Sequence, residues 1–109
     1  DYEVLENGLV EVDGVGTGFM RIRKEALKKI YDASEEYKEA GKENTCRMVF
    51  EVKVVDGSLY SEDITFCQKW IDMGGKIFID PTIDCAHSGE KRWVGNFQNW
   101  VSNNLPTKR

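Results

Sequence analysis

Hydrophobic and polar residues alternate along this chain with two periods, one typical of strands and one typical of helices. A period of two predicts strands over 9–13, 46–55 and 76–80. A helical period predicts helices over 24–40 and 62–73. Because the two kinds of element alternate, we expect an α/β fold in which a mixed sheet carries two or three packing helices.

Shorter patterns complete this prediction. Residues 19–23 and 82–87 have the character of extended segments, and 56–58 form a turn. Aromatic residues at positions i, i+4 and i+7 predict a C-terminal helix over about 91–103, with these residues as a packing face rather than a sugar platform. The aromatic residues are Trp93, Phe97 and Trp100. No repeat or interdomain linker is visible, so we expect residues 1–109 to form a single domain.

The composition excludes several classes of function. Hydrophobic residues make up 40% of the chain and charged residues 31%, with a net charge of −4 and basic residues that are scattered among acidic ones. This pattern predicts no nucleic-acid partner, and no apolar stretch is long enough to predict a membrane span. The start of the chain shows no secretion signal. The three cysteines form no CxxC motif and lie in apolar contexts, so we expect reduced thiols in a cytoplasmic protein.

Two adjacent acidic residues, Glu62 and Asp63, open the second predicted helix after Ser61. One interpretation is purely structural, because negative charges in the first turn are stabilised by the helix dipole. Helical geometry also aligns Asp63 with the apolar positions Phe66 and Cys67, whereas Glu62 points along a more polar side. The second interpretation is that Asp63 faces a cleft and accepts a proton from a bound hydroxyl.

Three glycines at positions 14, 16 and 18 lie between the first predicted strand and the segment 19–23. Their spacing is not that of a dinucleotide-binding fingerprint, and no phosphate-binding loop follows. They form either a flexible turn or a place where the backbone approaches a bulky ligand.

His87 is the only histidine in the chain and follows Asp84 and Cys85. A lone histidine is usually a hydrogen-bonded structural residue, and this group is too compact for a structural zinc site. A single metal ligand contributed to a larger site is the other interpretation.

These motifs, in this order, resemble the C-terminal half of a nucleotide-sugar-dependent glycosyltransferase of the GT-A fold, close to the family 2 enzymes. The segments that carry the resemblance are GVGTGFMRIRKEAL, SEDITFCQKWIDMGGKIFIDPTID and CAHSGEK, and together they lie within about residues 9–90. Three motifs in the same order are a more specific signal than any one of them.

The resemblance implies a role for each motif. Enzymes of this family have a glycine-rich loop on the acceptor side and an acidic motif whose Asp is the catalytic base in inverting members. Asp63 is then the general base, and Glu62 binds acceptor hydroxyls. The loop residues on the acceptor side are Gly14, Gly16, Thr17 and Gly18. His87 is one ligand of a divalent cation, Mn²⁺ or Mg²⁺, which neutralises the departing diphosphate.

The resemblance leaves one half of the family's fold without a counterpart. The N-terminal nucleotide-binding half, which ends in an Asp-x-Asp metal motif, is missing, and residues 11–13 are a strand beside the glycine loop rather than that motif. The chain is then an acceptor-side part that works with a missing half or with further copies of itself.

Two functions from different classes follow from these observations. The first is a glycosyltransferase that moves a sugar from a nucleotide-sugar donor to an acceptor hydroxyl with inversion. The second is a catalytically silent carbohydrate-binding or oligomerisation module derived from the same fold. Metal-dependent hydrolysis is disfavoured, because one histidine without clustered acidic residues cannot build a closed site.

Overall fold

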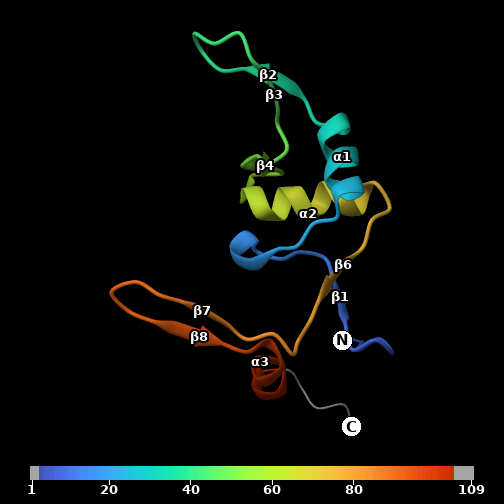
Figure 1. The fold of residues 1–109 in the computed structure, drawn as a ribbon, viewed down its shortest axis with the longest axis vertical. Helices are drawn as coiled ribbons and strands as arrows, with labels where there is room; N and C mark the ends of the chain where they lie inside the picture. The colour runs from blue at the N-terminus through green and yellow to red at the C-terminus, as the bar shows by residue number, and fades with distance from the viewer. Residues whose placement is uncertain (1–2, 105–109) are drawn as a thin grey trace. The chain divides into compact units, whose positions relative to one another are not determined.

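A computed structural model describes residues 3–104, and these form two compact units (Figure 1). One unit comprises residues 13–77, and the other comprises residues 3–12 together with 78–104. Helices and two-stranded sheets occur together, so the described chain has a mixed α/β class, as expected. Its strands form four separate two-stranded sheets, so the prediction of one mixed sheet is wrong for the described residues.

In the unit of residues 13–77, helix α2 (Glu62–Asp72) begins and ends close to where the sequence predicts. Ser61 occupies the N-cap position and precedes the two acidic residues. Beyond the other end, Gly74 has a φ of 84°, and its N–H donates to the carbonyl of Ile71 at 2.9 Å. Glycine adopts this left-handed conformation without a steric penalty, and it therefore ends the helix here. The predicted helix over 62–73 is confirmed to within one residue.

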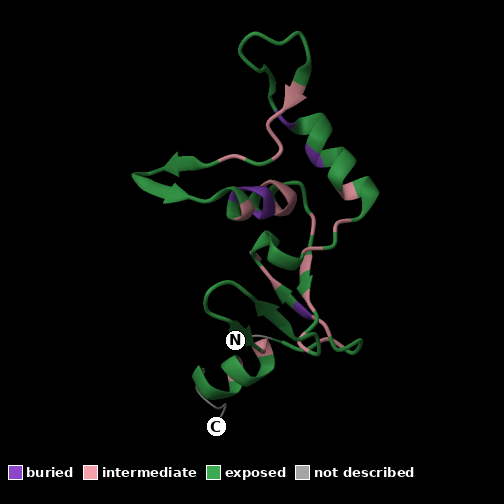
Figure 2. Ribbon diagram, turned by 60° about the vertical axis from the view of Figure 1, so that its left-hand side comes forward, coloured by how far each residue is buried: buried purple, intermediate pink, exposed green. Residues whose placement is uncertain are grey.

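Helix α1 (Lys24–Ala33) packs against α2, and the small core of this unit lies on the two helices (Figure 2). Ile30 of α1 and Cys67 of α2 are each 1% exposed, and Phe66 is also buried. The ring of Phe66 stacks on that of Phe50 with a centroid separation of 4.6 Å. Apolar burial of this kind is the main stabilising contribution to a domain of this size.

Helix α1 ends earlier than the predicted range of 24–40, because the buried Ser34 satisfies its last carbonyls. The Ser34 hydroxyl donates to the carbonyl of Ile30 at 2.6 Å, and its backbone N–H donates to that of Tyr31 at 3.1 Å. Serine competes in this way with continued helix formation. The predicted helix is therefore wrong beyond Ala33.

The residues that follow α1 form a hairpin instead. Strand β2 (Glu36–Lys38) pairs antiparallel with β3 (Thr45–Arg47), with Tyr37 opposite Cys46. Gly41, which the helical interpretation would place at a helix end, lies in the connection of this hairpin with a φ of 77°.

The predicted strand over 46–55 is interrupted in the structure. Its ends belong to β3 and to β4 (Lys53–Val55), which pair with different partners. Its middle forms no strand, because three carbonyls of this stretch accept hydrogen bonds from side chains of α2. Hydrogen bonds from distant residues therefore outweigh the alternating pattern here.

Strand β4 pairs antiparallel with β5 (Ser58–Tyr60), and Val54 lies opposite Leu59. The connection is the two residues Asp56 and Gly57, whose φ angles are 50° and 77°. Positive φ at both positions is the property of the type I′ turn that favours Asp-Gly in hairpins. The predicted turn at 56–58 is confirmed for Asp56 and Gly57, whereas Ser58 is the first residue of β5.

In the other unit, strand β1 (Val10–Val12) forms a two-stranded sheet with β6 (Ile77–Ile79), which begins at the last residue of the unit of residues 13–77. Both strands lie within the predicted strands. Strand β7 (Cys85–His87) pairs antiparallel with β8 (Trp93–Gly95), which is followed by helix α3 (Phe97–Asn104).

The predicted C-terminal helix over about 91–103 is wrong over its first residues, 91–96. Trp93 lies in a strand, where it pairs with His87. The helix begins after Asn96, whose side-chain carbonyl accepts a hydrogen bond of 2.9 Å from the N–H of Asn99. Asparagine is a favoured N-cap residue, so the helix starts where its first free N–H groups find an acceptor. No helix among residues 3–104 has the length and apolar character needed to cross a membrane.

Candidate functional site

The Asp63 carboxylate at the start of α2 uses its two oxygens differently. Asp63 Oδ1 accepts a hydrogen bond from the Ser61 hydroxyl and one of 2.9 Å from the N–H of Ile64. Asp63 Oδ2 lies on the side of the glycine loop, 3.6 Å from the position that a Cβ atom on Gly16 would take. The side chain is half-buried. One oxygen therefore fixes the carboxylate, and the other faces the glycine loop.

These hydrogen bonds lower the pKa of Asp63 below its ordinary value of 3.8, with the Ser61 hydroxyl as the largest cause and the Ile64 N–H as the next. Donors that favour the ionised form act in this direction. Asp63 is therefore a carboxylate throughout the neutral range and can accept a hydrogen bond or a proton from a bound hydroxyl.

Ser61 has a different role from the one that its N-cap position predicts. It occupies the N-cap, but its hydroxyl makes no capping hydrogen bond to a helix N–H. That hydroxyl donates to the Asp63 carboxylate instead. The sequence correctly predicts where the helix begins, whereas the orientation of the hydroxyl toward the candidate base becomes visible only in the structure.

The glycine loop lies against the first turn of α2. A Cβ atom built on Gly16 would lie 3.6 Å from Asp63 Oδ2, and one built on Gly14 would lie 3.2 Å from Ile64 Cδ1. The φ of Gly16 is −74°, which any residue can adopt, so its backbone conformation does not require glycine. The absence of a side chain instead keeps the space beside Asp63 Oδ2 open. The structure thus brings together the loop and the acidic residue that the sequence singles out separately.

The loop continues into a short 3₁₀ turn rather than into the extended segment predicted over 19–23. This turn comprises Thr17–Phe19, and the rest of that segment forms no strand. Thr17 and Gly18 are both exposed, and Phe19 is 79% exposed. Of the predicted loop residues, Gly16, Thr17 and Gly18 are therefore exposed, whereas Gly14 is half-buried.

The Cys67 side chain contacts this loop. The sequence shows only that Cys67 occupies an apolar position, and it does not predict the contact. The N–H of Val15 donates to Cys67 Sγ at 3.4 Å, and the Cys67 thiol donates to the carbonyl of Val15 at 3.6 Å. Val15 lies between the two glycines that touch the helix. Cys67 therefore attaches the middle of the loop to α2.

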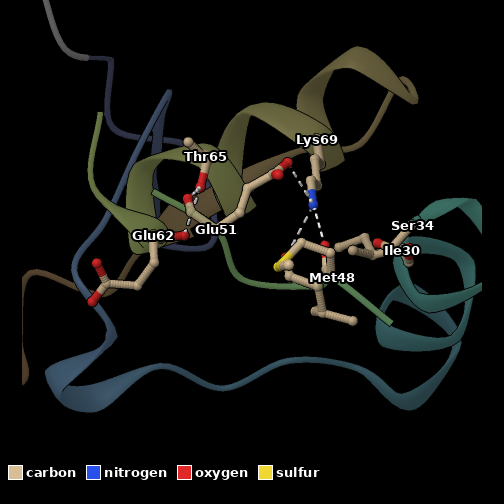
Figure 3. A network of polar contacts seen from close by, with 8 residues as sticks. Ile30, Ser34, Met48, Glu51, Glu62, Thr65 and Lys69 are labelled. Carbon is tan, nitrogen blue, oxygen red and sulfur yellow. Dashed lines mark hydrogen bonds and ion pairs between the residues drawn. The ribbon is translucent and has the colours of Figure 1, made fainter. Parts of the chain in front are cut away.

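Glu62 differs from Asp63 in direction. It is exposed, and Figure 3 shows its carboxylate pointing away from the polar network that joins Thr65, Lys69 and Glu51. Its backbone carbonyl accepts a hydrogen bond of 3.0 Å from the Thr65 hydroxyl. The sequence-based prediction that the two acidic side chains point in different directions agrees with this arrangement.

The polar network holds residues 48–51 on α2 (Figure 3). Lys69 Nζ donates to the carbonyls of Met48 at 2.5 Å and Val49 at 3.4 Å, and it lies 3.1 Å from Glu51 Oε1. The Thr65 hydroxyl donates to the carbonyl of Glu51. A groove of about 200 Å³ runs between α1 and α2 beside Lys69. It is lined by Ile30, Ala33, Ser34, Lys69, Asp72 and Met73. None of these six is a residue that the sequence analysis predicts for the site.

His87 belongs to the other unit, on strand β7. It is exposed, and its ring meets that of Trp93 edge-on at a centroid distance of 6.1 Å. Within residues 3–104, no three side chains of His, Cys, Asp or Glu are grouped so that they could hold a metal ion. The described residues therefore do not fit a complete Mn²⁺ or Mg²⁺ site, and His87 can supply one ligand at most.

The remaining polar residues near His87 have local structural roles. Asn96 donates from its side-chain amide to Asp84 Oδ1 while it caps α3. Asp80 Oδ1 accepts hydrogen bonds from the N–H and the hydroxyl of Thr82, and the hydroxyl is the main cause that lowers the pKa of Asp80. Asp80 therefore stabilises the turn that precedes β7, and Asp84 joins the two ends of the β7–β8 hairpin through Asn96.

Comparison of this chain with known protein families, with curated proteins and with solved structures gives no match. The candidate site therefore stands on its own geometry. It consists of the ionised Asp63 carboxylate, the hydroxyl that holds it, and the glycine loop beside its second oxygen. All of these residues lie in the unit of residues 13–77.

Proposed function

We propose that residues 13–77 form the acceptor side of a glycosyltransferase of the GT-A type, with Asp63 as the general base. The observation that carries this proposal is the position of Gly16 beside Asp63 Oδ2, with the other carboxylate oxygen fixed by Ser61 and Ile64. A fixed carboxylate with one open oxygen beside a glycine backbone is suited to orient an acceptor hydroxyl.

In the proposed reaction the acceptor oxygen attacks the anomeric carbon of a nucleotide-sugar. The new bond joins that oxygen to the anomeric carbon, and the bond from the anomeric carbon to the diphosphate breaks. The acceptor proton moves to Asp63 Oδ2, and the nucleoside diphosphate leaves with the electron pair of the broken bond. Attack from the side opposite the leaving group inverts the anomeric configuration.

Different residues of the chain bind different parts of the acceptor. Asp63 accepts the hydrogen bond of the reacting hydroxyl, while the exposed Glu62 contacts a neighbouring hydroxyl of the acceptor. Gly14, Gly16, Thr17 and Gly18 present backbone groups to the acceptor without bulky side chains. The nucleotide-sugar is bound by residues outside this site, in a donor-binding half or in a further copy of the chain. Because the described residues form no complete metal site, we derive no step through a cation.

The decisive experiment compares Asp63→Asn with Glu62→Gln in the protein that carries this sequence. Transfer is measured from a panel of UDP- and GDP-sugars to an array of glycans, beside the melting temperature of each variant. Asparagine keeps the size of the side chain and an acceptor for the Ile64 N–H, so Asp63→Asn is expected to fold normally. The loss of the proton acceptor is expected to lower turnover by about 10²-fold or more.

Glu62→Gln serves as the matched comparison, because it removes the adjacent charge and keeps the base. It is expected to raise the KM for the acceptor and to leave turnover close to that of the wild type. A folded Asp63→Asn variant with full turnover would show that Asp63 is not the base. Glycan binding without transfer from any donor would indicate the catalytically silent module instead.

A further inference from the structure

Cys67 contacts the glycine loop that lies beside the candidate base, Asp63. Its thiol is buried, with only 1% of the residue exposed, and it follows Asp63 by one turn on the same side of α2. Cys67 Sγ accepts from the N–H of Val15 at 3.4 Å, and the thiol donates to the carbonyl of Val15 at 3.6 Å. One side chain therefore satisfies both backbone polar groups of a loop residue.

This double contact matters because the glycines on either side of Val15 contribute no side chain that could hold the loop. Glycine has no side chain to pack and visits more backbone conformations than any other residue. Val15 lies between Gly14 and Gly16, and Gly16 is the residue beside Asp63 Oδ2. A change in the position of Val15 therefore changes the space in front of the carboxylate.

We propose that Cys67 is a positioning residue that holds the glycine loop at the distance from Asp63 at which an acceptor hydroxyl can bind. This inference rests on the proposed function for its catalytic consequence. Cys67 touches no reacting atom and acts only through Val15. Small displacements of groups that orient a substrate are known to lower rates by up to about 10²-fold, so a weak contact to the loop can have a large kinetic effect.

The first test measures hydrogen exchange of the Val15 amide by NMR in Cys67→Ser and Cys67→Val. Serine keeps a donor and an acceptor at this position, whereas valine keeps a buried apolar side chain and removes both. Exchange of the Val15 amide is expected to rise by about tenfold or more in Cys67→Val and to stay within about threefold of the wild type in Cys67→Ser. Cys46→Val is the control, because Cys46 lies half-buried in β3. It is expected to leave Val15 unchanged.

The second test measures transfer with the same variants. In Cys67→Val, kcat/KM for the acceptor is expected to fall on the order of tenfold, and Cys67→Ser is expected to recover most of this loss. A purely structural role would lower the melting temperature in both variants without this rescue. Cys67→Ala is the second variant if valine prevents folding, because it removes the hydrogen bonds without adding bulk.

Three outcomes would overturn the inference. They are unchanged Val15 exchange in Cys67→Val, faster exchange with unchanged transfer, and equal loss of transfer in the serine and valine variants. If the wild type shows no transfer with any donor, the proposed function fails, and the nuclear Overhauser contact between the Gly16 amide and Asp63 decides the positioning role. Its loss in Cys67→Val and retention in Cys67→Ser support the role of Cys67, and its retention in both rejects it.

Discussion

The indole ring of Trp70 lies against the backbone of Gly75, so that a Cβ atom on Gly75 would come within 2.1 Å of Trp70 Cε2. The same ring donates from Nε1 to the carbonyl of Lys76 at 3.1 Å, and the Gly75 N–H donates to the Trp70 carbonyl at 2.9 Å. The end of α2 and the chain that leaves it are thus joined by one aromatic side chain. Even a methyl group at Gly75 requires the indole to move.

We therefore expect Gly75→Ala to destabilise the protein by about 1–3 kcal/mol, as overpacking of an occupied site does. The measurement is the free energy of unfolding in urea, with Trp fluorescence as the probe. Gly18→Ala is the control, because a Cβ atom there meets nothing within 4 Å. A Gly75→Ala variant as stable as Gly18→Ala would show that the indole is not held in this position.

Replacement of Ser61 by alanine is expected to raise the pKa of Asp63. The hydroxyl of Ser61 is the largest cause of the lowered value, so its removal returns the pKa toward the ordinary 3.8. Carboxyl ¹³C shifts measured during an acid titration report this change directly. Ser58→Ala is the control, since Ser58 lies in β5, where it pairs with Val55.

The sign of the pH dependence follows from the lowered pKa of Asp63. Its stabilising contribution is present above the ordinary value of 3.8 and is lost as the pH falls through the lower folded value. The acid limb of transfer that reports Asp63 is likewise expected below that ordinary value and should move upward in Ser61→Ala. An acid limb that does not respond to Ser61→Ala would mean that another group limits activity.

Larger side chains at Gly16 are expected to close the space beside Asp63. In Gly16→Ala the added Cβ lies 3.6 Å from Asp63 Oδ2, an ordinary contact, so transfer should fall only a few-fold. Leucine covers the carboxylate, and we expect kcat/KM in Gly16→Leu to fall on the order of 10²-fold. Steady-state kinetics with a fixed donor concentration measure this series. Gly95→Ala is the control, because a Cβ atom at Gly95 meets nothing within 4 Å. Equal activity of the alanine and leucine variants would contradict the assignment of Gly16.

Lys69→Met is expected to destabilise the fold by about 1–2 kcal/mol, because it leaves the carbonyls of Met48 and Val49 without their charged donor. Lys28→Met is the matched control. The ion pair of Lys28 with Asp32 is mostly exposed and joins residues four apart on one helix, so its loss should change stability by less than about 0.5 kcal/mol. Chemical unfolding of both variants gives the comparison, and equal effects would argue against a supporting role for Lys69.

Local signals in the sequence predicted some elements well. Helix α2 could be placed because Ser61 and Gly74 mark its ends, and the turn at Asp56 could be placed because the following glycine favours positive φ. These signals depend on the conformational preferences of the residues themselves. They hold without knowledge of what packs nearby.

The remaining elements depend on contacts between residues far apart in the chain, which periodicity does not reveal. The alternation over 46–55 predicts a continuous strand. In the structure, the side chains of Lys69 and Thr65 donate hydrogen bonds to the carbonyls of its middle residues. The helical spacing of Trp93 with Phe97 predicts a longer C-terminal helix, but Trp93 pairs with His87. In both cases a partner outside the local segment decides the structure.

The candidate site was predicted in part for the same reason. Asp63 and the glycine loop stand out by residue type, but their proximity, with a Cβ atom on Gly16 at 3.6 Å from Asp63 Oδ2, is visible only in the structure. The two contacts that shape the site are those of Ser61 with Asp63 and of Cys67 with Val15. The orientation of a hydroxyl group and the contact of a buried thiol correspond to no recognisable spacing of residues in a sequence. These two contacts are therefore visible only in the structure.

The Asp56-Gly57 turn has a consequence for the order in which the chain folds. It joins β4 directly to β5, so pairing Val54 with Leu59 closes only a very short loop. Such hairpins form within about 1–10 μs, because little chain entropy is lost before the first contacts are made. A two-stranded hairpin by itself is only marginally stable, so it will form and dissolve repeatedly until α2, which follows it directly, is in place. If folding nucleates at this turn, the residues next to Ser61 become ordered early. The glycine loop, which is distant in the sequence, then packs against α2 at a later step.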